Sequence, residues 1–158
     1  MTKRKILIAN GPNLGILGQR QPACMHMRQG LPGIYGTDGI DAILDAVRSR
    51  VGDAVIVEHL QTNHEGVLID ALNAKAHDPL YVGVILNAGA WTHTSLAVAD
   101  AVAAMDAPVV EVHISNVHAR EDVRRNSLIA PVCRGVITGF GIHSYVLAAD
   151  YLMTLADK

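Results

Sequence analysis

Five short runs of apolar, mostly β-branched residues recur along the chain, and they constrain its fold more than any other feature. The runs are continuous rather than alternating, which is typical of strands buried on both faces of a parallel sheet. Segments with helical spacing of apolar residues lie between most of them, as parallel strands require. The chain is therefore predicted to be an α/β three-layer sandwich with right-handed crossovers. The strands are expected at residues 6–9, 55–57, 82–86, 109–112 and 135–138.

The helices are expected at residues 40–47, 68–72, 96–105 and 146–155. Asp38 is a candidate N-cap of the first, and Thr94 or Ser95 of the third. Residues 10–39 contain no readable regular element and are rich in glycine and proline. A loop of that length in a compact domain is usually functional, although a tolerated surface insertion is the plainer alternative.

Length and composition narrow the function classes. The 158 residues correspond to a single domain, 1–158, and half of them are hydrophobic. A net charge of −2 provides no basic field, so nucleic-acid binding is not expected. The apolar run that follows the first five residues is too short for a signal peptide or a membrane span, which favours a cytoplasmic protein without a membrane partner. Two cysteines, Cys24 and Cys133, cannot form a disulfide scaffold.

Polar side chains follow the first four predicted strands at the point where each strand ends. In an open parallel sheet, ligands bind beyond the carboxyl ends of the strands. Asn, His, Ser and Arg side chains meeting there suit a small, oxygen-rich, anionic ligand. The segments are residues 10–15, 59–66, 87–95 and 113–121.

One pair at the end of the fourth predicted strand indicates catalysis. Glu111 and His113 are two apart in a strand, so they share a face, and the carboxylate is placed to orient the imidazole as a proton donor. Arg120 and Arg124 would share a helical face suited to an anion, unless they are part of a solvated turn. The eight histidines show no metal-ligand spacing, so no metal site is expected. His93 beside a helix start and Asn13 beside a proline also have purely structural interpretations.

Together the motifs resemble the type II 3-dehydroquinate dehydratases over nearly the whole chain. The resemblance implies a flavodoxin-like fold with a five-stranded parallel sheet and a homo-oligomer, a dodecamer of trimers. It implies a cofactor-free anti elimination of water from a small-molecule substrate, 3-dehydroquinate, through an enolate. The matching segments are residues 10–14 (NGPNL), 61–66 (QTNHEG), 87–95 (NAGAWTHTS), 111–121 (EVHISNVHARE) and 135–141 (GVITGFG).

The resemblance also implies a role for individual residues. Tyr35 would be the base, kept ionisable by Arg20 on a lid loop, and Asn13 would hold a water that stabilises the enolate. His113 would protonate the leaving hydroxyl, oriented by Glu111. Asp100 would reach a neighbouring subunit's site. The substrate-binding positions would be Asn87, His93, Asp100, Ile114, Ser115 and Arg124.

The chain departs from the family's pattern in the lid. About ten residues are inserted between Arg20 and Tyr35, so Arg28 is an alternative to Arg20 as the supporting cation. Asn126 and Leu128 stand where His and Tyr are usual. Two other functions therefore stay open. The protein could be a lyase of the same fold for another cyclic hydroxy-keto acid, or it could bind such acids without catalysing a reaction.

Overall fold

The sheet has five parallel strands in the order β2-β1-β3-β4-β5, with β1 pairing to both β2 and β3. The computed structural model describes residues 3–19 and 38–156. The predicted α/β class and five-stranded parallel sheet are confirmed. The strands are β1 (Arg4–Asn10), β2 (Val55–Gln61), β3 (Tyr81–Asn87), β4 (Val109–His113) and β5 (Gly135–Thr138).

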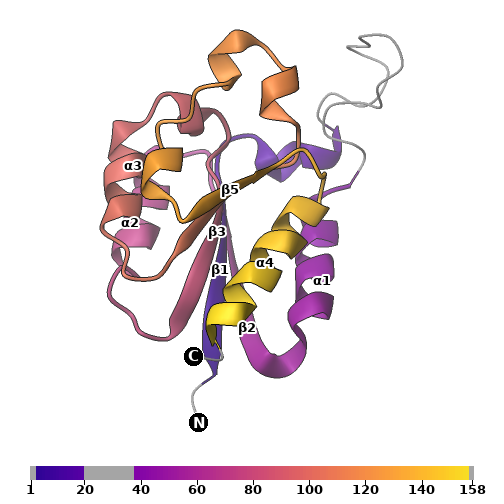
Figure 1. The fold of residues 1–158 in the computed structure, drawn as a ribbon, viewed down its shortest axis with the longest axis vertical. Coiled ribbons are helices and arrows are strands. Elements are labelled where there is room, and N and C mark those ends of the chain that lie inside the picture. The colour runs from indigo at the N-terminus through magenta and orange to yellow at the C-terminus, as the bar shows by residue number, and fades with distance from the viewer. Residues whose placement is uncertain (1–2, 20–37, 157–158) are drawn as a thin grey trace.

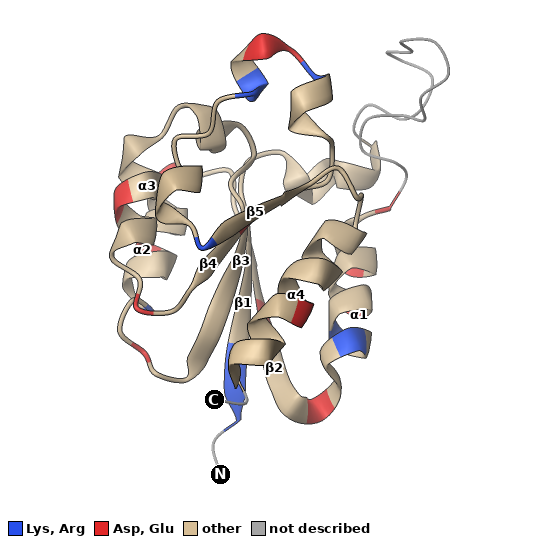
Figure 2. Ribbon diagram, viewed as in Figure 1, with Lys and Arg blue, Asp and Glu red and all other residues tan. Residues whose placement is uncertain are grey.

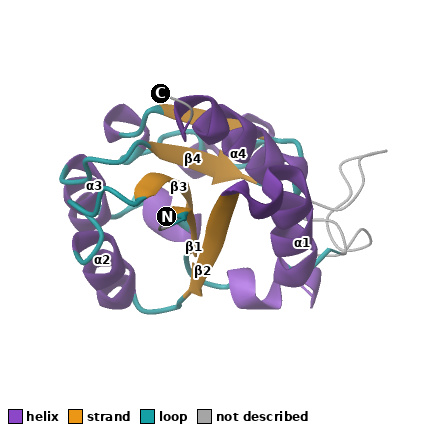
Figure 3. Cartoon of the chain, turned by 90° about the horizontal axis from the view of Figure 1, so that it is seen from below, coloured by secondary structure: helices purple, strands orange, loops and turns teal. Residues whose placement is uncertain are grey.

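Helices cover both faces of the sheet (Figures 1 and 3). Apolar residues of α1 and α4 pack with one face in a first core cluster, and those of α2 and α3 pack with the other in a second. At Gly83 on β3, an added Cβ would lie 2.3 Å from a methyl carbon of Leu152 on α4, so glycine permits this close packing. The helices are α1 (Ile40–Val51), α2 (Glu65–Asn73), α3 (Leu96–Ala103) and α4 (His143–Ala156).

One expected helix cap and one strand end are wrong, and one of the two candidates for another cap is confirmed. Gly39, not Asp38, occupies the N-cap of α1. Ser95, not Thr94, caps α3, since its side chain accepts a 2.9 Å hydrogen bond from the Val98 amide. β2 continues to Gln61, so His59 lies within the strand rather than after it. The reason is that β2 is an edge strand, where polar residues interrupt the apolar run without ending the hydrogen-bonded ladder.

The connection from β4 to β5 crosses the carboxyl edge of the sheet in three short 3₁₀ turns, η4 (Val117–Ala119), η5 (Asp122–Arg124) and η6 (Ala130–Val132). In the stretch that contains η5, two acidic residues are flanked by basic ones (Figure 2). Within residues 3–19 and 38–156, no helix is long and apolar enough to cross a membrane. The carboxyl edge of the sheet, with this connection above it, is where the candidate site lies.

Candidate active site

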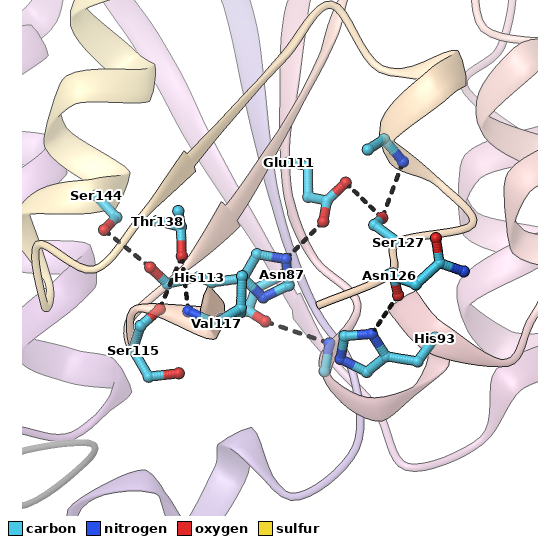
Figure 4. A network of polar contacts seen from close by, with 12 residues as sticks. Asn87, His93, Glu111, His113, Ser115, Val117, Asn126, Ser127, Thr138 and Ser144 are labelled. Atoms are coloured by element: carbon cyan, nitrogen blue, oxygen red, sulfur yellow. Dashed lines mark hydrogen bonds and ion pairs between the residues drawn. The ribbon is translucent and has the colours of Figure 1, made fainter. Parts of the chain in front are cut away.

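The Glu111 carboxylate and the His113 imidazole form a buried ion pair or hydrogen bond at the end of β4 (Figure 4). Glu111 Oε1 lies 2.6 Å from His113 Nε2, and Glu111 is 1% exposed. The contact expected from their spacing in the strand is therefore present. Because one ring nitrogen is held by the carboxylate, the tautomer and orientation of the imidazole are restricted. This arrangement suits a general acid whose other ring nitrogen serves the ligand.

Glu111 has a second partner from the β4–β5 connection. The Ser127 hydroxyl donates a 3.0 Å hydrogen bond to Glu111 Oε2, and Ser127 Oγ accepts a 2.9 Å bond from the Ala130 amide (Figure 4). Both oxygens of the buried carboxylate are therefore engaged, as burial of a charged group requires.

His93 is held by the same connection. Its Nδ1 lies 2.7 Å from the main-chain oxygen of Asn126 (Figure 4). The Leu128 amide donates a 2.8 Å bond to the Thr92 carbonyl. Since a carbonyl only accepts, Nδ1 of His93 carries the proton. The contact uses the main chain at residue 126, so the presence of asparagine rather than the usual histidine does not remove it.

Asn87 ends β3 in a network that reaches across the sheet. Its Nδ2 donates a 2.9 Å bond to the Tyr145 hydroxyl, which donates a 2.7 Å bond to Asn10 Oδ1, and Asn87 Oδ1 accepts from the Gly89 amide. Asn10 Nδ2 in turn lies 3.3 Å from His59 Nε2. Burial raises the pKa of Tyr145 above its ordinary value, so its hydroxyl stays protonated and is a donor to Asn10. The network fixes which end of the Asn87 amide faces the site.

The segments after β1 and β3 touch through their main chains. An added Cβ at Gly11 would lie 2.5 Å from the Ala88 carbonyl oxygen, and Gly89, at φ +58°, lies against Pro12. The glycines therefore allow the two segments to approach as closely as they do. Asn13 follows in the left-handed region at φ 65°, and its amide donates to Asn63 Oδ1 over 2.9 Å.

Two arginines close one side of the site. Arg120 Nη1 lies 3.4 Å from Ser115 Oγ, and both Arg120 and Arg124 contact the Glu121 carboxylate. A hydrogen bond to its own main chain and the charges of the two arginines lower the pKa of Glu121. The guanidinium groups are thereby held at the rim in positions that suit an anionic ligand.

The structure brings most of the predicted site residues together. Glu111 lies behind His113, outside the cleft wall, and Asn13 is exposed beside Leu14, which does line the cleft. Asp100 is exposed on α3 and is not part of the lining within this chain. Tyr35, Arg20 and Arg28 lie outside the described residues. A single cleft is lined by Asn87, His93, His113, Ile114, Ser115 and Arg124.

Within the described part of the chain, the Cys133 thiol is poorly suited to react as a thiolate. Burial and the nearby charge of Glu111 raise the pKa of the Cys133 thiol to about 12. Among residues 3–19 and 38–156, no group of three or more His, Cys, Asp or Glu side chains is placed to hold a metal ion.

Sequence reasoning did not single out Ser127, Tyr145 or the main chain of Asn126. A serine in a loop and a tyrosine within an apolar helix have no distinctive pattern, and a main-chain acceptor leaves no mark in side-chain identity. The signal available was the buried carboxylate itself, because Glu111 needs a donor for each of its oxygens.

Comparison with known proteins agrees with the resemblance of the motifs. The family model described as dehydroquinase class II matches residues 4–153. A 3-dehydroquinate dehydratase of Exiguobacterium sp. is 51% identical over 150 residues, covering 94% of both chains. A 3-dehydroquinate dehydratase of Jannaschia sp. is 49% identical, covering 94% of this chain and 93% of that protein. The crystal structure of the type II dehydroquinase from Propionibacterium acnes has a TM-score of 0.84 and 36% identity, and covers 98% of both chains.

A match along this length, with these identities and the same fold, leads to one conclusion: the chain belongs to the class II dehydroquinase family.

Proposed function

We propose that this protein is a 3-dehydroquinate dehydratase of type II, which removes water from 3-dehydroquinate to give 3-dehydroshikimate. The observation that carries the proposal is the Glu111–His113 contact at the wall of a cleft that Asn87, His93 and Arg124 also line. Such a cleft offers an oriented acid, amide and imidazole groups for hydroxyls, and a guanidinium for a carboxylate. The names of the relatives, 3-dehydroquinate dehydratase, support the same substrate.

The reaction has two halves. A base removes a proton from the carbon next to the ketone, and the electron pair moves onto the ketone oxygen as an enolate. A water held by Asn13 donates to that oxygen. The enolate then re-forms the ketone and expels the hydroxyl at the β carbon, to which His113 gives a proton, so that water leaves and a conjugated double bond forms. Hydrogen-bond donors aimed at the developing charge lower the barrier of the first half.

Tyr35 is the base in this proposal, and the other tyrosines support that choice. Tyr145 is fully buried with a raised pKa, and Tyr81 has a raised pKa and donates to Glu58 at the start of β3. Tyr151 accepts a hydrogen bond from Arg134, the residue before β5. The hydroxyls of these three tyrosines form hydrogen bonds with residues outside the proposed role of the base. Of the four tyrosines of the chain, this leaves Tyr35. Arg20, or Arg28 in its place, supplies the cation that keeps it ionisable.

The assembly belongs to the same proposal. In this proposal Asp100, which is exposed on α3, reaches the site of a neighbouring subunit in a dodecamer built from trimers. Sedimentation of the purified protein at several concentrations tests this, and a monomer under assay conditions contradicts it.

The test of function is direct. Adding 3-dehydroquinate to the purified full chain should raise the ultraviolet absorbance of the enone product, and His113→Gln should abolish the rise. If a related quinate-like acid is turned over in preference to 3-dehydroquinate, that acid is the substrate instead. Tight binding measured by calorimetry, without any turnover, would instead show a silent binder.

A further inference from the structure

We propose that Ser127 is a positioning residue for the general acid, acting through Glu111 on His113. The inference rests on the proposed function, in which His113 is the acid. It concerns a residue outside the cleft lining, in the connection between β4 and β5.

The first step is the state of the carboxylate. Glu111 is 1% exposed, with Oε1 on His113 Nε2 at 2.6 Å and Oε2 on the Ser127 hydroxyl at 3.0 Å (Figure 4). A buried carboxylate that loses a donor is left with an uncompensated oxygen, so it rotates or takes up a proton. Either change would weaken the contact by which the carboxylate orients the imidazole.

The second step is the direction of the Ser127 hydroxyl. A serine hydroxyl has one proton and two lone pairs. Ser127 Oγ accepts from the Ala130 amide at 2.9 Å, so the oxygen is fixed by the main chain of η6 and its proton points toward Glu111. Ser127 is thus a preset donor, and its hydroxyl does not have to be oriented again during the reaction.

The third step is that the same turn holds the second histidine. The Asn126 carbonyl accepts from His93 Nδ1 at 2.7 Å, and the Leu128 amide donates to the Thr92 carbonyl at 2.8 Å. The three residues 126–128 therefore set the positions of both imidazoles relative to each other. Ser127 contributes the hydrogen bond to Glu111, and through Glu111 it affects the position of His113.

The chain contains a matched control for this role. Ser95 Oγ accepts from the Val98 amide three residues later, as Ser127 Oγ accepts from the Ala130 amide three residues later, and both bonds are 2.9 Å. Ser95 caps α3, whereas Ser127 also donates to Glu111. Substituting each serine with alanine removes the same main-chain contact, so a difference between the two variants reports on Glu111.

The experiment compares Ser127→Ala, Ser127→Thr and Ser95→Ala by steady-state kinetics and by NMR of the His113 ring, assigned with His113→Gln. Ser127→Ala should lower kcat about tenfold with KM changed less than about twofold, because orientation of the acid affects the transition state more than substrate binding. Its His113 ring resonances should shift and broaden. Ser127→Thr, which keeps the hydroxyl, should restore kcat and the spectrum, and Ser95→Ala should match the wild type in both.

A Ser127→Ala variant with the wild-type kcat and an unchanged His113 spectrum would overturn the assignment. A fall in kcat that Ser127→Thr does not restore would also overturn it. The NMR comparison does not need turnover, so a wild-type protein inactive on 3-dehydroquinate would refute the proposed function while the spectra still decide the role of Ser127. If Ser127→Ala does not fold, Ser127→Cys, of similar size but a weak donor, replaces it in the same comparison.

Discussion

Tyr145 and Asn87 are 58 residues apart in the sequence, and their side chains share a 2.9 Å hydrogen bond in the interior between α4 and β3. The bond ties a helix on one face of the sheet to a residue that lines the candidate active site. The Tyr145 hydroxyl also donates to Asn10, so one oxygen connects α4 with two neighbouring strands.

We expect Tyr145→Phe to lower the free energy of unfolding by about 1–3 kcal/mol, because Asn10 and Asn87 are both left buried with an unmade hydrogen bond. Urea unfolding followed by circular dichroism measures this. Tyr81→Phe is the matched control at the other end of β3, where the hydroxyl partner, Glu58, is partly exposed and keeps its ion pair with Lys5. Equal losses in the two variants would contradict the special role of the Tyr145 hydroxyl.

Glu111→Gln tests whether the charge behind His113 matters for catalysis. The amide is isosteric but carries no charge to stabilise a protonated imidazole, so kcat should fall by at least about tenfold with little change in KM. Asp106→Asn is the control, since Asp106 forms the same kind of contact with His77, at 2.9 Å on the exposed surface. Unchanged kcat in Glu111→Gln would mean that His113 does not act as a carboxylate-supported acid.

His59 should make stability depend on pH. Burial and the charge of Arg48 lower its pKa from the ordinary 6.5. The unfolded chain then binds a proton at His59 more readily than the folded chain, so the free energy of unfolding decreases as the pH falls below about 6.5. His59→Gln removes the titrating group while offering Asn10 an acceptor. Its curve of unfolding free energy against pH should be flatter than the wild-type curve between pH 7 and about 5, and parallel curves would contradict the expectation.

Two glycines should respond in opposite ways to alanine. At Gly11 the new Cβ would lie 2.5 Å from the Ala88 carbonyl oxygen, so the segments after β1 and β3 must separate, and both stability and turnover should decrease. At Gly66 in α2 the Cβ meets nothing within 4 Å, so alanine should stabilise the helix by about 0.5–1 kcal/mol. Thermal unfolding and initial rates measure both effects. A Gly11→Ala variant as stable and active as the wild type would show that the two segments need not touch.

Tyr35→Phe should reduce turnover to less than about a tenth of the wild-type rate, a barrier increase of more than roughly 1.4 kcal/mol, while substrate binding stays nearly intact. Steady-state rates and calorimetric titration with 3-dehydroquinate separate the two quantities. A higher residual rate would exclude Tyr35 as the base.

Arginine variants test which of Arg20 and Arg28 supports Tyr35 in the proposed mechanism. Loss of activity in Arg20→Ala but not in Arg28→Ala would assign the role to Arg20, and the reverse result would assign it to Arg28.

The sequence by itself determined the class of the fold and one contact of the candidate site. The apolar runs defined five buried strands, because continuous β-branched residues suit a sheet covered on both faces. The spacing of Glu111 and His113 defined their contact, because residues two apart in a strand share a face. Both inferences depend on local geometry, which a short stretch of sequence fully specifies.

The tertiary structure alone decided the partners that hold the site in place. Ser127 reaches Glu111 across 16 residues, the Asn126 carbonyl reaches His93 across 33, and Tyr145 reaches Asn10 across 135. The length of β2 also depended on its neighbours, since its polar residues are tolerated at the edge of the sheet. The physical reason is that a buried polar group requires a partner but does not specify from where in the chain it comes. The path of the chain across the carboxyl edge of the sheet determines which residue becomes the partner.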